Sequence, residues 1–278
     1  MFRLFVNLIV LFCTHTPCRA AEGISLVEEY KKNSNQQWEW ALTSLANFPF
    51  TEQDKVLDVG CRDGRITALI ANQVQSGSVV GLDISEKMIE QASNAFQEGN
   101  LKFIKGNAND IPFKEEFDKV VSFCTLQWIV EQEKALISMK ESFKVGGGML
   151  LVIPGESSSN LGTLAKKIAS TEKWRGYFPH FKMERVYYSP KAYKNLLQVI
   201  GLDIQALRAE ESVTIYENKE AFIAWLKPLV NFVDHLAPDL QQSFIEELAD
   251  QMIQKDLFFT GSVAIPDVKI EIIARRLY

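Results

Sequence analysis

Cysteine and histidine are scarce in this chain, with four and three residues in 278. Cys13 and Cys18 fall in an N-terminal segment, which leaves Cys61 and Cys124 for the rest of the chain. Two cysteines form no disulfide framework, and their spacing matches no metal site. His180 has no cysteine or histidine at metal-binding spacing. We therefore expect no metal centre.

A strongly basic stretch is also missing. The net charge is −5 at pH 7, and the lysines and arginines are scattered. This pattern argues against nucleic acid as a partner and favours a small organic ligand. Hydrophobic residues make up 47% of the chain, which is enough for a large core and argues against disorder. Nothing in the sequence indicates an oligomeric state.

A hydrophobic run long enough to cross a bilayer is absent, so no stable membrane span is expected. The one apolar run, residues 4–13, follows the charged start Met1-Phe2-Arg3 and precedes Cys18-Arg19-Ala20. This order is typical of a secretory signal peptide cleaved after Ala20. Residues 1–20 therefore predict export, whereas a short apolar helix or a mis-chosen start codon would leave the protein cytoplasmic.

Two glycines of a hydride-transfer dinucleotide loop, G-x-G-x-x-G, are missing as well. The three glycine positions hold Gly60, Arg62 and Arg65, which argues against a nicotinamide enzyme. What is present is a run of branched apolar residues around Asp58 that ends in a turn between Gly60 and Gly64. Such a run is typical of a buried parallel strand followed by a loop whose backbone approaches a ligand closely.

A second acidic residue, Asp83, ends the next apolar run, residues 79–83, and follows Gly64 by 83 − 64 = 19 positions. Roughly 20 residues is the spacing at which an acidic side chain accepts hydrogen bonds from ribose hydroxyls. The pair Asp58 and Asp83 therefore predicts an adenosine-binding site. Without Asp83, a purely structural strand–helix turn would explain the loop equally well.

Strands and helices alternate along the chain, which predicts a doubly wound α/β fold with helices on both faces of a mostly parallel seven-stranded sheet. A helical cover is expected between the last two strands. We expect a single domain over residues 21–278, with its core at about 50–154 and the cover and last strands at 155–278. The strands are expected at 56–59, 79–82, 101–104, 117–123, 149–153, 204–215 and 268–274.

Four motifs follow one another along this pattern: Val56–Cys61, Gly81–Asp83, Gly106–Ala108 and Phe117-Asp118. Together they resemble the class I S-adenosylmethionine-dependent methyltransferases. The resemblance implies S-adenosylmethionine as the cofactor. It places Asp58 and Gly60 at the methionine part, Asp83 at the ribose, Ile84 and Met88 at the adenine, and Asn107 at the adenine amino group, with Gly64, Ala108 and Phe123 completing the site. The chain departs from the family at Arg62, usually glycine, and at Asn107, often aspartate.

The segment Ser122–Trp128, with Tyr30–Asn33 and Gln37, is similar to the juvenile hormone acid and trans-aconitate carboxyl methyltransferases. That resemblance implies that Gln37 and Trp128 hold the carboxylate of the substrate. Neighbouring subfamilies share the Leu-Gln-Trp ending. On their own, Trp128 is equally typical of a packed core residue and Gln37 of a helix surface.

Carboxyl O-methylation of an apolar acid or a polyacid is the activity these resemblances favour, through neutral donors on Gln37 and Trp128. The alternatives are N- or O-methylation of another small acceptor, and a protein that binds S-adenosylmethionine without turnover, which Arg62 would favour. Aromatic residues late in the chain either line a pocket for an apolar acid or simply pack the cover. They are Trp174, Tyr177, Phe178, Phe181, Phe222, Trp225 and Phe232.

Overall fold

The computed structural model describes residues 36–157, 160–181, 185–253 and 262–278. The predicted signal peptide, residues 1–20, lies outside these ranges and stays a prediction, as does the location of the protein. In chain order the helices and strands are α2 (Gln36–Leu45), β1 (Lys55–Val59), α3 (Arg65–Ala71), β2 (Ser78–Asp83), α4 (Glu86–Ala95), β3 (Leu101–Lys105), β4 (Phe117–Phe123), η1 (Leu126–Trp128), α5 (Gln132–Ser142), β5 (Phe143–Pro154), α6 (Leu161–Ala169), α7 (Pro190–Val199), β6 (Leu202–Tyr216), α8 (Lys219–Leu226), η2 (Lys227–Leu229), η3 (Asn231–Val233), α9 (Pro238–Met252) and β7 (Val263–Arg276).

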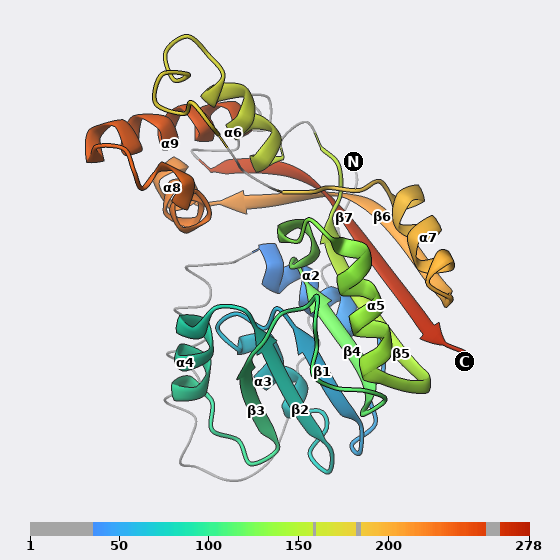
Figure 1. Cartoon of the computed structure of the whole chain (residues 1–278). Coiled ribbons are helices and arrows are strands. Elements are labelled where there is room, and N and C mark those ends of the chain that lie inside the picture. The colour runs from blue at the N-terminus through green and yellow to red at the C-terminus, as the bar shows by residue number, and fades with distance from the viewer. Residues whose placement is uncertain (1–35, 158–159, 182–184, 254–261) are drawn as a thin grey trace, which may run out of the picture. The chain divides into compact units, whose positions relative to one another are not determined.

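The described strands form one seven-stranded sheet in the order β3-β2-β1-β4-β5-β7-β6 (Figure 1). The first five strands pair in parallel, and β7 runs antiparallel to both β5 and β6. The predicted mostly parallel, doubly wound sheet is therefore confirmed. The chain moves outward from β1 to β3 and then returns to the other side of β1 with β4. Ligands of such sheets bind where the strand order reverses, at the carboxyl ends of the strands.

The central strands are buried on both faces, as their continuous apolar runs predict. Neighbouring residues of β1 point to opposite faces, so Val56 and Leu57 belong to two different hydrophobic clusters. Val56 packs with α2 and α3, and Leu57 packs with residues of α5 and α7. The helices packed on the two faces thereby fix the position of β1 and of the loop that follows it.

Two helices begin at serine caps. The Ser85 hydroxyl accepts a hydrogen bond from the Met88 N–H at the start of α4, and the Ser189 hydroxyl accepts one from the Ala192 N–H at the start of α7. Both serines satisfy backbone donors that a helix leaves free at its first turn. Ala92 is the only fully buried residue of α4.

The three glycines at 146–148 lie inside strand β5, although the sequence predicted this strand to begin only at residue 149. The pairing of β4 with β5 is irregular at this point, since Phe117 pairs with Phe143 and Lys119 pairs with Gly148. Four residues of β5 are therefore looped out opposite a single residue of β4. Gly146 has a φ of 83°, which is why glycine suits this bulge.

The residues 160–181 and 219–253, here called the cover, form a separate hydrophobic cluster of their own with the ends of β6 and β7. Helices α6, α8 and α9 lie together at this end of the two strands (Figure 1). Helix α8 ends at Leu226 and a short 3₁₀ turn containing Pro228 follows, as the proline predicts. The predicted helical cover between the late strands is confirmed.

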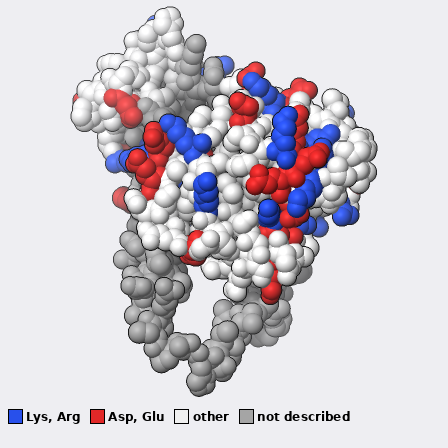
Figure 2. All heavy atoms as spheres, turned by 60° about the horizontal axis from the view of Figure 1, so that its bottom comes forward, with Lys and Arg blue, Asp and Glu red and all other residues white. Residues whose placement is uncertain are grey.

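Acidic and basic side chains are intermixed on the face shown in Figure 2, with no broad area of one sign. Several pairs tie strand ends together, such as Lys144 with Asp118 and Arg276 with Glu115. Among the residues the structure describes, no helix is long and apolar enough to span a membrane. The same residues contain no group of three or more histidine, cysteine or acidic side chains placed to hold a metal ion.

Candidate active site

The loop after β1 is held in a conformation that requires glycine. Gly60 and Gly64 have φ angles of 81° and 80°. A β-carbon at Gly60 would collide with the Thr125 side chain, and one at Gly64 would lie 2.6 Å from the Phe103 ring. The N–H groups of Gly60 and Cys61 both donate to the Leu82 carbonyl, so the loop turns back over the end of β2. The sequence prediction of a tight turn at this point agrees with this geometry.

Asp83 joins this loop to the start of α4. One carboxylate oxygen accepts a hydrogen bond from the Arg62 N–H at 3.0 Å, and the other accepts one from the Ser85 N–H at 2.9 Å. A carboxylate offers about four acceptor positions, so two more bonds fit the same group. Asp83 and the glycine loop, which the sequence predicted to form one site, are therefore in direct contact.

Asp58 lies below this loop and is fully buried. The Thr67 hydroxyl donates to it at 2.7 Å. Burial raises the pKa of the Asp58 carboxyl to about 7; the Thr67 bond lowers it, and the charges of Asp83 and Asp63 raise it further. The Asp58 carboxyl is thus about half-protonated near neutral pH. A cation close to it would favour loss of the proton.

The residues predicted to surround the adenine lie at the ends of β2 and β3. Asp83 pairs with Lys105 in the sheet, so the segments that follow these two positions leave the sheet at the same edge. The Ile84 side chain is 68% exposed, although it is apolar. Asn107 is exposed, and its side-chain oxygen accepts a hydrogen bond from the Asn109 N–H at 2.9 Å. Ala108 and part of Met88 are covered by neighbouring residues.

Three residues span the point where the strand order reverses. The side chain of Arg62 donates to the Gln37 oxygen at 2.5 Å, and the Gln37 amide nitrogen donates to the Phe123 carbonyl at 2.9 Å. Gln37 is therefore a buried residue that links β1 to β4, and not the surface residue that helix position alone suggests. Phe123 has its ring in the core, so only its backbone faces this chain of bonds.

Arg62 has a φ of 50°, in the left-handed region where the related family usually has glycine. Its side chain reaches towards α2 and ends on Gln37. Among the described residues it forms no ion pair with an acidic side chain. The guanidinium thus lies beside the end of β4, without an acidic partner in the part of the chain that the structure describes.

Trp128 is the second predicted substrate residue, and it is not a core plug. Its side chain is 46% exposed. The guanidinium carbon of Arg185 lies 3.5 Å from the centre of the indole ring. The segment that carries Arg185 is held by two bonds, from the Val186 N–H to the Gln127 carbonyl and from the Gln132 side chain to the Val186 carbonyl.

The sequence analysis missed Arg185. A single arginine in a polar loop has no periodicity and belongs to none of the motifs that pointed to the site. Its role is visible only because the chain returns, 57 residues after Trp128 (185 − 128), to stack the guanidinium on that ring.

Comparison with known proteins gives the family. A methyltransferase domain model matches residues 50–207, which is more than half of the chain. The chain belongs to the methyltransferase domain family. It is 26% identical over 225 residues to the trans-aconitate 2-methyltransferase of Variovorax paradoxus strain S110, covering 78% of this chain and 85% of that methyltransferase. It is 26% identical over 214 residues to the juvenile hormone acid O-methyltransferase of Bombyx mori, covering 71% and 73%.

Among solved structures, the fold is shared with the phosphoethanolamine N-methyltransferase 2 of Haemonchus contortus in complex with S-adenosylhomocysteine. The TM-score is 0.57 at 16% identity, covering 87% of this chain and 53% of that methyltransferase. The chain is an S-adenosylmethionine-dependent methyltransferase of the class I type, as the sequence resemblance implied.

The residues of this methyltransferase fit the cofactor. Asp83 keeps acceptor positions for ribose hydroxyls beside its two backbone bonds, and Ile84 presents an uncovered apolar surface next to it. The Arg62 side chain turns towards Gln37.

Proposed function

We propose that this methyltransferase transfers a methyl group to the carboxylate of a small-molecule acid. The observation that carries the proposal is the pairing of both predicted substrate residues with an arginine. Arg62 contacts Gln37, and Arg185 stacks on Trp128. Guanidinium groups bind carboxylates through charge-assisted hydrogen bonds, so an acid is the acceptor that this surface attracts most strongly.

The named acceptors of the two curated relatives, trans-aconitate and juvenile hormone acid, are both carboxylic acids, which supports the same reading. We assign Asp83 to the ribose, Asp58 and the Gly60–Gly64 loop to the methionine part, and the Asn107 amide with Ile84 to the adenine. The carboxyl group of Asp58, with a pKa of about 7, gains negative charge near neutral pH and so favours a cationic ligand above it.

Bound S-adenosylmethionine supplies an electrophilic methyl group on a positively charged sulfur. A carboxylate is already ionised at pH 7, so the protein needs no general base. Its task is to orient one carboxylate oxygen and to exclude water, which favours a step in which opposite charges disappear. Gln37 positions Arg62 for this task, because its amide is committed to Phe123 and its oxygen to the guanidinium. Trp128 offers its ring and indole N–H as the second contact.

The direct test uses S-adenosylmethionine labelled in its methyl group, incubated with the full chain and a panel of carboxylic acids. A methyl ester releases its label as methanol in mild alkali, whereas a methylated nitrogen or an ether does not. We expect base-labile label in at least one acid. Label that is stable in alkali would contradict carboxyl transfer and would indicate N- or O-methylation of another acceptor. No transfer to any of the acids would contradict the proposal.

A further inference from the structure

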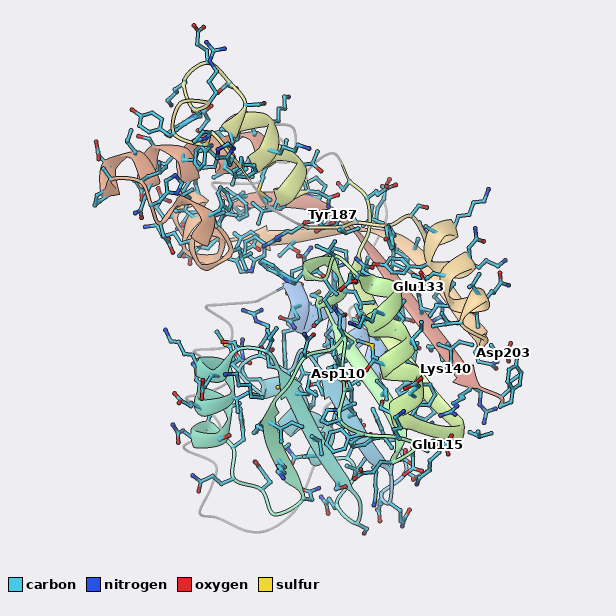
Figure 3. The ribbon with its side chains drawn as sticks, viewed as in Figure 1. Asp110, Glu115, Glu133, Lys140, Tyr187 and Asp203 are labelled. Atoms are coloured by element: carbon cyan, nitrogen blue, oxygen red, sulfur yellow. The ribbon has the colours of Figure 1, made fainter. Side chains whose placement is uncertain are left out.

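A cavity of about 550 Å³ lies beside Trp128, between the sheet and helix α6. Glu156, Ser157, Asn160 and Thr163 line it from one segment, and Arg185 and Tyr187 line it from another. Both walls meet α6, since Arg185 and Tyr187 are the nearest neighbours of Gly162. Figure 3 labels Tyr187, which lies between the cover helices and the sheet. Arg185, which lines the cavity, also contacts the predicted substrate residue Trp128.

Arg185 brings a positive charge to this cavity. Its Nε is buried and has no hydrogen-bond partner among the described residues. A terminal nitrogen donates to the Leu229 carbonyl at 3.3 Å, and Tyr187 is a further hydrogen-bond partner, but no acidic side chain within the described ranges forms an ion pair with Arg185. Burial is costly for a charged group and lowers the pKa of Arg185, an effect that the charge and the hydrogen bond of Tyr187 oppose. An anion from outside would remove that cost.

The rest of the cavity wall is polar. Asn160 is buried, accepts a hydrogen bond from the Ser157 N–H at 2.7 Å and donates to the Gly155 carbonyl at 3.2 Å, so it holds this wall in shape. Thr163 and Tyr187 contribute hydroxyl groups. Glu156 is the only acidic group among the described lining residues, and it is exposed at the rim, where water screens it.

The aromatic residues expected to line an apolar pocket do not line this cavity. They pack against each other inside the cover: the Trp174 and Phe244 rings are 5.0 Å apart and the Phe178 and Phe244 rings 5.1 Å apart. Trp174 and Phe244 are fully buried, and Phe178 is nearly so. The sequence preference for an apolar acid therefore loses its support in the described part of the chain.

We infer that the methyl acceptor carries a second anionic group, which Arg185 binds in this cavity while a carboxylate of the same molecule is methylated beside Trp128. This inference rests on the proposed carboxyl transfer and narrows its substrate class to small acids with two or more anionic groups. The second group is a carboxylate or a phosphate, since both match the guanidinium. Arg185 is then a specificity-determining residue.

The test compares matched acids as methyl acceptors: a monocarboxylate, the dicarboxylate of equal chain length, and the monocarboxylate that ends in a phosphate. For the wild-type chain we expect kcat/KM to be higher for at least one dianionic acid than for the monocarboxylate. Arg185→Gln should lower kcat/KM for that dianionic acid about ten- to hundredfold, the range for loss of a charged hydrogen bond, and should lower kcat/KM for the monocarboxylate much less. The dicarboxylate and phosphate arms identify the second group.

Two controls separate a binding effect from misfolding. Arg175→Gln removes an exposed arginine of the cover and should leave kcat/KM unchanged for every acceptor. Arg185→Lys keeps the charge and should restore part of the preference for the dianionic acid. Affinity for S-adenosylhomocysteine, measured by calorimetry, should stay the same in all three variants.

Equal losses for monocarboxylate and dianionic acid in Arg185→Gln would overturn the inference and leave carboxyl transfer standing. So would a wild-type chain that prefers the monocarboxylate. If no acid in any arm receives base-labile label, carboxyl transfer itself fails and the second anionic group fails with it.

Discussion

The loops at the carboxyl ends of β1 and β2 and the cover differ in how their residues are held. The loops are fixed by polar contacts to a few backbone groups, such as those of Asp83 with Arg62 and Ser85. The cover is fixed by aromatic rings that contact one another, with Trp174 at its centre. The first arrangement leaves polar groups directed at a ligand, whereas the ring cluster of the cover leaves none, and the cover adds polar groups only where Asn160 and Thr163 line the cavity. The difference indicates that the cover supports the site, while the loops and Arg185 contact what binds there.

The largest loss of stability is expected when the residue at the centre of the cover is removed. Trp174→Ala deletes a fully buried ring, and we expect a loss of about 3–5 kcal/mol in the free energy of unfolding. Urea unfolding measures it. Under conditions where the variant is folded, its affinity for S-adenosylhomocysteine should match that of the wild type. Tyr177→Ala, at a half-exposed ring of the same cover, is the matched control and should cost far less.

The loop region should depend on pH instead. The pKa of Asp58 is about 7 in the folded chain, against an ordinary value of 3.8. Between these values the folded chain holds a proton that the unfolded chain has released. The stability from Asp58 is therefore complete below about pH 4 and is lost as the pH rises through 7, up to about 4 kcal/mol in all.

In the absence of cofactor, Asp58→Asn should abolish this fall in stability with rising pH. Urea unfolding at a series of pH values measures it. Asp118→Asn is the control with the opposite sign. Burial raises the pKa of Asp118, but the bonds from Lys144 and from the Lys55 N–H outweigh burial and lower it. A stability of the Asp118→Asn variant that is flat from pH 4 to 8 would contradict the role given to Asp58.

Cofactor binding should respond to the loops alone. Asp83→Ala removes the carboxylate that accepts from two backbone N–H groups and that we assign to the ribose, and we expect affinity for S-adenosylhomocysteine to fall about a hundredfold. Calorimetry measures it. Glu86→Ala, at an exposed residue three positions on that pairs with Lys105, should change the affinity little. Comparable losses in both variants would remove Asp83 from the ribose.

The smallest effect is expected at the substrate side. Trp128→Phe keeps an aromatic ring for Arg185 but removes the indole N–H, so turnover should fall about tenfold, the value of one hydrogen bond. Affinity for S-adenosylhomocysteine should hold. The measurement is kcat with the best acid from the labelled panel. Unchanged turnover would show that the indole N–H does not contact the acceptor.

Much of the loop region could be predicted from the sequence, because its constraints are local. Gly60 and Gly64 need left-handed backbone, and Asp83 follows its strand at a fixed spacing, so each leaves a mark in the chain. Arg62 was recognised as a departure from the glycine usual in the family. The direction of its side chain, however, depends on Gln37, which lies on helix α2.

The substrate side could not be predicted in the same way. Arg185 meets Trp128 only through the return of the chain after the cover, and no local pattern records such a contact. The aromatic residues near Trp174 gave a hydrophobic signal that suited either a pocket or a core. Only their mutual packing decides for the core.

Hydrogen exchange of the full chain, with and without S-adenosylhomocysteine, tests the contrast between the two regions most directly. We expect the cofactor to slow exchange in residues 60–64 and 83–88, at the ends of β1 and β2, and to leave the amides of α8 and α9 unchanged. Protection that appears first in α8 and α9, or no protection in either loop at saturating ligand, would contradict the account.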